Sequence, residues 1–419
     1  MAASPSRGGE RLTLDGRIVA GVAVAVFLIV LGAVGSVRGG GTPWRKVGVD
    51  ATSTRFEDLR SITSSWDCER KGIEAFPLNP CDPYGRPANY PRLWTKLSVL
   101  GLGEGATTAL GVAVGLIFLV AALAATGPLS TREGVLYAAL LVAPATMIGV
   151  ERGNVDLLMF ALVVLGLALV RRSPWAGAGP IVLAAVLKLF PAFALAVLVR
   201  RRGRWAALGA SVLVLAVYAA LTLNDIRTLR HVIPRAVLNA YGAGVVPVAL
   251  HDEGVSWMRS GSDERLLRLG IIAAGLLLAG GFLLGRRGGA AAADERRLDA
   301  FWAGAGVYVG TYLYGNNFDY RLVFLLLCVP QLSSWAWGGG APAPWPGAVL
   351  VAMVATFWLS SAFPPLPFGL QSWYLHLKAP PEELLNWAIF AWLVAALVSG
   401  VVSLLWPRPA ARLEELGQQ

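Results

Sequence analysis

The sequence holds little charge and few of the side chains that most enzymes use for catalysis or metal binding. Only 15% of the 419 residues are charged, whereas a soluble domain carries roughly a quarter. This composition argues against a water-soluble fold. The three histidines, His231, His251 and His376, are scattered without metal-ligand spacing, so we expect no metal site.

Motifs for hydrolysis and nucleotide binding are missing as well. The sequence has no P-loop, no GxGxxG and no Ser/His/Asp order. It also has no Asp-x-Asp, a pattern with which metal-dependent enzymes commonly hold nucleotide-sugar diphosphates. Nucleotide-dependent chemistry is therefore not indicated.

The net charge of +10 does not indicate nucleic acid, because of where the basic residues lie. They cluster in short loops beside apolar blocks: Arg171-Arg172, Arg200 to Arg204, Arg286-Arg287 and Arg296-Arg297. This is the pattern of loops on the cytoplasmic side of a membrane. We expect membrane lipids as partners and no nucleic acid.

What the chain does have is hydrophobic length. Hydrophobic residues make up 56% of it, in blocks of about 17 to 25 residues, enough to cross about 30 Å of hydrocarbon. The blocks predict an all-α polytopic membrane protein of about ten transmembrane helices, at 18–37, 105–126, 134–150, 155–170, 205–222, 266–285, 298–314, 322–337, 345–361 and 385–406. We expect one transmembrane domain, 18–406, between a cytoplasmic amino terminus (1–17) and a cytoplasmic tail (407–419), with outer loops at 38–104 and 223–265.

The block 174–199 has basic clusters at both ends, which a single crossing cannot place on the same side. It predicts a re-entrant helical hairpin broken near Lys188 and Pro191, since proline disfavours helix before it. Non-helical backbone at that depth survives where it lines a cavity, so we expect Lys188 in one. The alternative is a lysine that snorkels to the surface.

The first outer loop interleaves aromatic, acidic and basic side chains, a mixture that suits sugar stacking and phosphate pairing. An interfacial loop with an aromatic belt would look similar. Cys68 and Cys81 lie in this loop, where an oxidising compartment would favour a disulfide over two free thiols. Cys328 lies within a predicted helix and is expected to pack there.

Two further polar groups lie at predicted outer helix ends. In Glu151-Arg152-Gly153-Asn154-Val155-Asp156, three charges are costly unless paired or used. A helix cap, made by Asn154 or Asp156, is the simpler interpretation. In the loop 315–321, Asp319 and Arg321 lie on either side of Tyr320. The simpler interpretation of these two charges is an ion pair with each other.

Residues 150–204 resemble the family 87 branch of the GT-C glycosyltransferases. The resemblance rests on Gly153-Asn154, the small-residue run 176–179, Lys188-x-x-Pro191 and the following arginines. In the first outer loop it rests on Phe56-x-Asp58, Gly72, Asp82-Pro83-Tyr84 and Tyr90-Pro91.

The resemblance implies a GT-C-like bundle and a glycosyltransferase whose sugar donor is linked to polyprenyl phosphate. Because this donor is a substrate, no cofactor is expected. Transfer would be metal-independent and inverting, to a glycan, glycolipid or protein acceptor on the outer side. Asp58 matches the family's general base, with Asp82 and Asp67 as substitutes. We expect phosphate contacts from Lys188, Arg152 and Arg321 beside Glu151 and Asn154, and sugar or acceptor contacts from Asn89, Tyr90, Arg92, Asn317 and Asp319.

Two other functions remain open at this point. A transporter or flippase of lipid-linked sugars would usually carry ionisable residues at the bilayer midplane, in broken helices of two related halves. The sequence has one broken segment. A non-catalytic scaffold of envelope synthesis would leave the outer charged residues individually dispensable.

Overall fold

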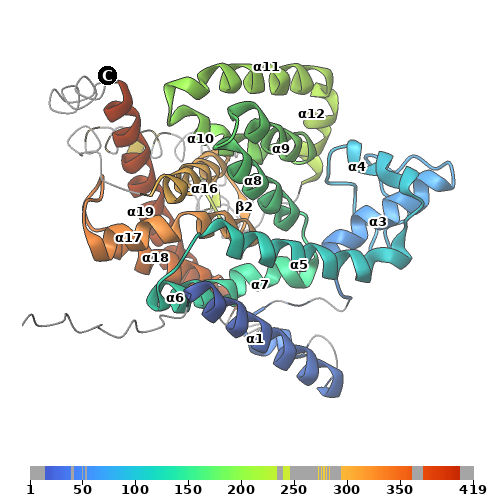
Figure 1. Ribbon diagram of the computed structural model, residues 1–419. Helices are drawn as coiled ribbons and strands as arrows, with labels where there is room; N and C mark the ends of the chain where they lie inside the picture. The colour runs from blue at the N-terminus through green and yellow to red at the C-terminus, as the bar shows by residue number, and fades with distance from the viewer. Residues whose placement is uncertain are drawn as a thin grey trace, which may run out of the picture.

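The protein is a bundle of α-helices with almost no sheet (Figure 1). The computed structural model describes residues 15–38, 42–49, 51, 54–233, 239–245, 294–360 and 371–405, with isolated positions between 272 and 283. In these ranges the only strands are β1 (Ala240–Tyr241) and β2 (Asn317–Phe318), which pair antiparallel with Ala240 opposite Phe318.

The helices follow the chain in this order. The amino-terminal half contains α1 (Gly16–Arg38), α2 (Thr42–Lys46), α3 (Glu57–Arg70), α4 (Leu93–Lys96), η1 (Leu97–Leu100), η2 (Glu104–Ala106), α5 (Thr107–Ala125), α6 (Thr131–Leu141), α7 (Pro144–Arg152), α8 (Asp156–Val170), α9 (Pro174–Leu187), η3 (Phe190–Leu195) and α10 (Ala196–Val199). It is followed by η4 (Arg202–Arg204), α11 (Trp205–Leu221), α12 (Leu223–Val232), α16 (Glu295–Tyr314), η5 (Asp319–Leu327), α17 (Val329–Gly338), α18 (Pro346–Leu359) and α19 (Gln371–Leu405).

Four helices in the described ranges are long and apolar enough to cross a membrane: Gly16–Val37, Glu104–Ala125, Arg202–Leu221 and Glu382–Leu405. The pair α6 and α7, bent by 52°, would make a fifth if it is one span. Other apolar helices, such as α8 and α18, have 10–17 residues, fewer than the roughly 20 that a span needs. The prediction of about ten spans therefore stays a prediction, and its span 266–285 lies almost wholly outside the described residues.

Breaks within the predicted spans explain much of this difference. The span predicted at 134–150 divides because Pro144 starts α7, while Ser130 and Glu133 form a capping box that starts α6. The span predicted at 322–337 is also two elements, η5 and α17. Hydropathy cannot reveal such breaks, because the residues on both sides are equally apolar.

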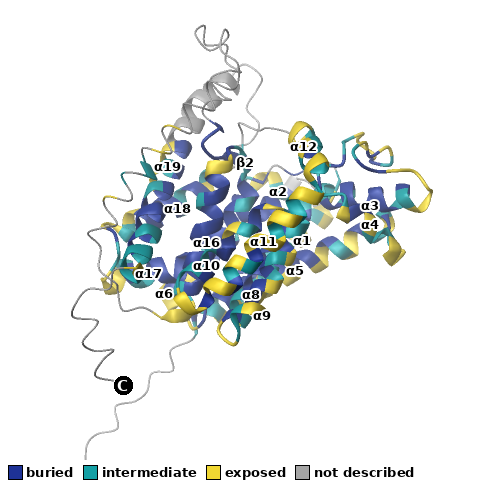
Figure 2. Cartoon of the chain, turned by 90° about the horizontal axis from the view of Figure 1, so that it is seen from above, coloured by how far each residue is buried: buried dark blue, intermediate teal, exposed yellow. Residues whose placement is uncertain are grey.

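The predicted loop 38–104 contains helices of its own. Its residues from 54 onward, with α3 and α4, form a lobe at one side of the bundle (Figures 1 and 2), which we call the α3–α4 lobe. A disulfide joins Cys68 to Cys81, with 5.7 Å between their Cα atoms. The Trp66 indole donates a hydrogen bond of 2.7 Å to the Trp94 carbonyl, which holds α4 against α3.

Small residues bring α8 and α9 together. A Cβ on Gly166 would lie 2.7 Å from the Gly177 carbonyl oxygen, so only glycine allows this approach. α9 ends at Leu187, and the chain breaks at Lys188 and Leu189 before η3, within the predicted hairpin 174–199. The path of this segment through a bilayer stays a prediction.

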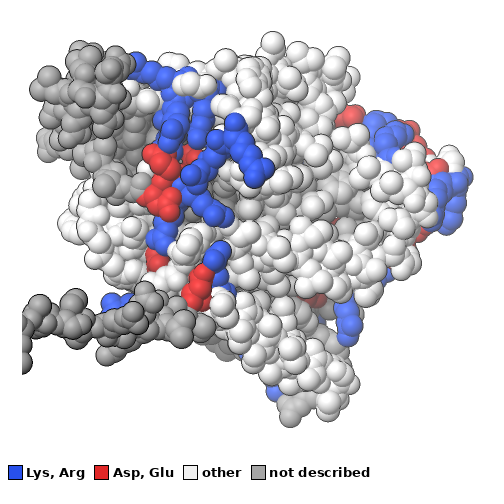
Figure 3. All heavy atoms as spheres, in the orientation of Figure 1, with Lys and Arg blue, Asp and Glu red and all other residues white. Residues whose placement is uncertain are grey.

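Charged side chains gather in separate zones of the face shown in Figure 3. One zone covers the α3–α4 lobe, and the other lies beside α10 and the start of α16. A broad uncharged surface separates them, as expected where hydrocarbon would cover the protein.

Candidate active site

Phe56 fixes the start of α3 against the bundle. Its backbone is left-handed, with φ 57°, and its N–H donates to the Glu151 carbonyl at 3.1 Å. Its ring lies where a Cβ on Gly111 would be, 2.4 Å from the nearest ring atom, and also touches the site of a Cβ on Gly153. Asp58, in the first turn of α3, is thereby held beside the turn between α7 and α8.

Asp58 is joined to α8 by one side-chain amide. Its Oδ2 accepts a hydrogen bond of 2.6 Å from Nδ2 of Asn154. Oδ1 of Asn154 accepts from the backbone N–H of Asp156 at 2.9 Å. Asn154 is 1% exposed, and these bonds fix which way its amide faces.

Asp156 binds cations from distant parts of the chain. Its side chain is fully buried, with Oδ1 at 2.5 Å from Nζ of Lys188 and Oδ2 at 3.1 Å from Nε of Arg321. The side chains of Lys188 and Arg321 are 16% and 13% exposed. This trio, the Asp156 cluster, has one more positive than negative charge.

Aromatic rings lie under both cations. Nζ of Lys188 is 4.9 Å from the centre of the Tyr90 ring, and Cζ of Arg321 is 4.2 Å from the centre of the Phe190 ring. Such contacts stabilise a partly desolvated cation by about 0.5–2 kcal/mol.

The broken end of α9 presents Lys188 in an extended conformation, with φ −160° and ψ 96°. The carbonyls that the break releases are satisfied by side chains. The Tyr218 hydroxyl donates to Val186 at 3.0 Å, and the Trp94 indole donates to Leu187 at 2.9 Å. The break is therefore a built feature of the fold, as backbone away from water requires.

Arg321 is held by the loop that precedes it. It donates through Nη1 to Oδ1 of Asn317, whose Nδ2 donates to the Thr311 carbonyl at 2.6 Å. Asp319, fully buried, accepts from the Ser360 hydroxyl. The loop 315–321 is thus a folded platform, and Arg321 turns from Asp319 to the more distant Asp156.

The Tyr320 hydroxyl lies within electrostatic range of both Asp58 and Asp156. The charges of Asp58, Asp156, Arg152 and Arg321 all act on its hydroxyl. The charge of Asp58 also acts on Lys188 and Tyr90. Asp58, Asn154, Lys188, Arg321, Tyr90, Asn317 and Arg152 thus belong to one region, together with the backbone of Glu151.

Other predicted residues lie in separate networks. The side chain of Asp82 is fully buried and forms an ion pair of 2.9 Å with Arg86. Although burial opposes it, Asp82 and Glu57 raise the pKa of the Arg86 guanidinium. Asp67 pairs with Arg70 and accepts from the Glu104 N–H at 2.9 Å.

The remaining predicted sugar contacts are less clustered. Arg92 pairs with Glu74 within the α3–α4 lobe and with Asp225 of α12. Asn89 is half-buried just before Tyr90. Their proposed contacts with sugar stay predictions.

Asp156 was predicted only as a possible cap of the following helix, whereas the side chain that accepts from the first N–H of α8 is that of Asn154. The sequence did hold a signal for Asp156. It is an acid at the first position of an apolar helix, and the chain also carries a single lysine, Lys188, within an apolar block. Phe190 and Tyr320 were missed because aromatic residues are common in apolar segments.

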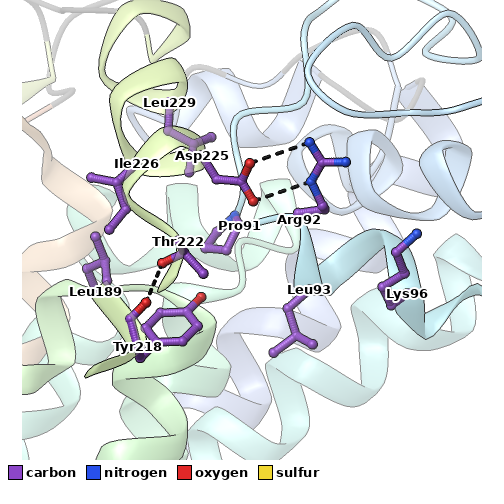
Figure 4. Close-up of a pocket in the computed structure, with 10 residues that line it drawn as sticks. All are labelled: Pro91, Arg92, Leu93, Lys96, Leu189, Tyr218, Thr222, Asp225, Ile226 and Leu229. Carbon is purple, nitrogen blue, oxygen red and sulfur yellow. Dashed lines mark hydrogen bonds and ion pairs between the residues drawn. The ribbon is translucent and has the colours of Figure 1, made fainter. Parts of the chain in front are cut away.

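A cavity of about 250 Å³ opens beside the break in α9 (Figure 4). Its wall is mainly apolar, formed by Pro91, Leu93, Leu189, Tyr218, Ile226 and Leu229. The ion pair of Arg92 with Asp225, at 3.3 Å, also lines it. Leu189 follows Lys188 directly, so the cavity adjoins the backbone that carries the cation.

Comparison with known proteins gives a family match. Residues 93–303 match glycosyltransferase family 87. No curated protein and no solved structure matches the chain. The matched region includes Asn154, Asp156 and Lys188, whereas Asp58 and Arg321 lie outside it. Because the match covers just over half of its length, the chain belongs to glycosyltransferase family 87 and is a glycosyltransferase.

Proposed function

We propose that the protein transfers a sugar from a polyprenyl-phosphate carrier to a hydroxyl group of an acceptor on the outer side of the membrane. The observation that carries this proposal is the pairing of Lys188 and Arg321 on Asp156. Asp156 alone does not balance the two partly buried cations that it contacts, and a bound anion would offset the surplus charge. Phosphate suits this pair, because lysine supplies a point charge and arginine a planar fork of donors.

Lys188 and Arg321 keep N–H groups that can face a ligand. Arg321 uses Nε on Asp156 and Nη1 on Asn317, out of five N–H donors on a guanidinium. In the proposed reaction these groups stabilise the charge that develops on the departing lipid phosphate. Asp156 positions both cations and reduces their mutual repulsion.

Asp58 is the proposed general base. It accepts the proton of the acceptor hydroxyl while that oxygen bonds to the anomeric carbon and the bond from this carbon to the phosphate oxygen breaks. A single displacement inverts the anomeric configuration. The hydrogen bond from Asn154 orients the carboxylate and keeps one of its oxygens, Oδ1, for the acceptor.

The cavity beside Leu189 supports a lipid-linked donor. An apolar wall next to a phosphate-binding cation suits the first isoprenoid units of the carrier. The charge distribution supports the outer location, because Arg200, Arg201 and Arg204 pair with acids at the start of α16, and the charged zone there is remote from the α3–α4 lobe.

The experiment that tests this function is an assay of purified protein in lipid nanodiscs with a panel of radiolabelled polyprenyl-phosphate sugars. Asp58→Asn keeps the hydrogen-bonding shape but cannot take a proton, so we expect transfer to fall about 10²–10⁴-fold. Asp67→Asn is the matched control, since its carboxylate is engaged by Arg70 and the Glu104 N–H. We expect that variant to retain most of its rate.

A wild-type rate in Asp58→Asn would remove Asp58 from the role of base. A purified protein that moves lipid-linked sugar across a vesicle membrane, but transfers none of the panel, would replace the proposal with transport.

A further inference from the structure

A second buried polar cluster lies in the carboxyl-terminal half of the chain. It combines Tyr308 and Tyr312 of α16, Asp319 of η5, and Glu383 and Asn386 of α19, all between 0% and 3% exposed. We call it the Glu383 cluster. Polar side chains buried this deeply in an apolar bundle are costly unless they are paired or used.

Part of the cluster is fully bonded and therefore fixed in place. The Tyr308 hydroxyl donates to Oδ1 of Asn386 at 2.9 Å, and Nδ2 of Asn386 donates to Oε1 of Glu383 at 3.3 Å. The backbone of Gly242 also acts on Glu383 electrostatically. The Tyr241 ring stacks on Tyr308, with 5.3 Å between ring centres.

Other atoms of the cluster are buried without a hydrogen-bond partner. These are Oε2 of Glu383 and the hydroxyl of Tyr312. The Tyr312 ring is held by Phe390 at 4.6 Å and Trp387 at 5.2 Å between ring centres. A buried donor and a buried acceptor left unpaired are what a ligand with hydroxyl groups satisfies.

The Glu383 cluster adjoins the phosphate-binding side chains. Asp319 is two residues before Arg321 on the same platform, and its charge acts on Glu383. Tyr241, which stacks on Tyr308, is influenced by both Arg321 and Asp156. The start of η5 thus contributes Arg321 to the Asp156 cluster and Asp319 to the Glu383 cluster.

The chemistry of the second cluster is complementary to that of the first. The carboxyl groups of Glu383 and Asp319 do not attract phosphate but form hydrogen bonds with hydroxyl groups. No group of three or more acidic, histidine or cysteine side chains suited to a metal occurs in the described ranges. A ligand that carries hydroxyl groups offers both a donor and an acceptor to the unpaired atoms.

We propose that the Glu383 cluster binds a sugar ring of one of the two substrates, through Glu383 and the Tyr312 hydroxyl. This inference rests on the proposed function. Glu383 and Tyr312 would determine which sugar is accepted, since they contact hydroxyl groups and not the reacting atoms.

The test compares two tyrosines that would respond in opposite ways. Tyr312→Phe removes a hydroxyl that has no protein partner, so thermal stability should not fall, while the KM for one substrate rises about fivefold. Tyr137→Phe is the matched control, because the buried Tyr137 hydroxyl donates to the Ala122 carbonyl at 3.0 Å. That variant should lose stability and keep both KM values.

The sugar that binds is identified by which KM changes. A rise confined to the polyprenyl-phosphate sugar assigns the cluster to the donor, and a rise confined to the acceptor assigns it to the acceptor. Glu383→Gln, which retains the shape but replaces one carboxyl oxygen with an amide nitrogen, should raise the same KM about tenfold.

Unchanged KM values for both substrates in Tyr312→Phe and Glu383→Gln would overturn the inference, provided that wild type and Tyr137→Phe transfer sugar normally. Absence of transfer by wild type would instead count against the proposed function. The two failures are thus distinguishable.

Discussion

The Asp156 cluster has a counterpart elsewhere in the molecule. Asp299 of α16 is 2% exposed and also pairs with two cations, Arg200 and Arg204, both at 2.8 Å. Here a second carboxylate, Glu295, pairs with Arg200, so the two buried arginines face two acids. The additional Arg201 is half exposed, where water screens its charge.

The remaining donors of the two clusters also differ. Nη1 of Arg204 donates to the Val197 carbonyl at 3.2 Å, which ties η4 to α10. In the Asp156 cluster, the cations lie over Tyr90 and Phe190, and Asn154 leads on to Asp58. The same arrangement of two cations on one aspartate thus joins helices at Asp299 and leaves a surplus charge at Asp156.

The largest expected effect is on stability, at Asp299. Asp299→Asn leaves Arg204, only 7% exposed, as a buried charge without a carboxylate, so the free energy of unfolding should fall by about 3–5 kcal/mol. Denaturant unfolding in mixed micelles measures this change. The kcat of the protein that remains folded should be unaltered.

Asp225→Asn is the control for this comparison. Its ion pair with Arg92 is partly exposed, with side chains at 26% and 41%, and should contribute no more than about 1 kcal/mol. Equal losses in the two variants would contradict a special role for the Asp299 cluster.

The second expected effect is on catalysis, at Lys188. Lys188→Met should lower kcat about 10²–10³-fold, because one of the cations that stabilise the departing phosphate is lost. Arg321 still pairs with Asp156, so unfolding should change by no more than about 1 kcal/mol. Single-turnover transfer at saturating donor measures the chemical step.

Lys96→Met provides the control, as Lys96 is 61% exposed and pairs with Glu69 on the α3–α4 lobe. If Lys188→Met unfolded the protein as severely as Asp299→Asn while the folded fraction stayed active, the two clusters would be equivalent structural pairs.

The smallest expected effect concerns the ring beneath Arg321. Phe190→Leu should raise the donor KM about two- to fivefold, because the cation–π contact that holds the guanidinium is lost. Phe118→Leu is matched, since both rings make edge contacts with another phenylalanine, at 5.2 Å for Phe118 and 5.4 Å for Phe190. An equal rise in KM for both variants would assign the effect to packing alone.

Local sequence signals predicted several parts of the fold. The lone lysine and the following proline predicted a break near Lys188, because proline removes a backbone donor wherever it lies in the fold. The small-residue run 176–179, noted for its resemblance, includes Gly177, which packs closely against α8. The division of the predicted span 134–150 was not foreseen, because hydropathy averages over a kink.

The candidate site was only partly predictable. Lys188, Arg321 and Asn154 were each identified from charge or resemblance, but their shared partner Asp156 was considered only as one of two possible helix caps. A local ion pair of Arg321 with Asp319 was one of two alternatives, and Arg321 instead pairs with Asp156, far away in the sequence. Distance along the sequence favours Asp319 as the partner of Arg321. The direction of the Arg321 side chain on the folded loop instead brings it to Asp156.

The sequence by itself determined the apolar, helical character, the break at Lys188 and the types of side chain available, since length, hydropathy and proline geometry are local properties. Only the tertiary structure decided that α3, α8, α9 and η5 converge, so that one buried carboxylate holds cations from distant segments. Such pairings depend on which helix faces meet, and packing across the whole bundle sets that.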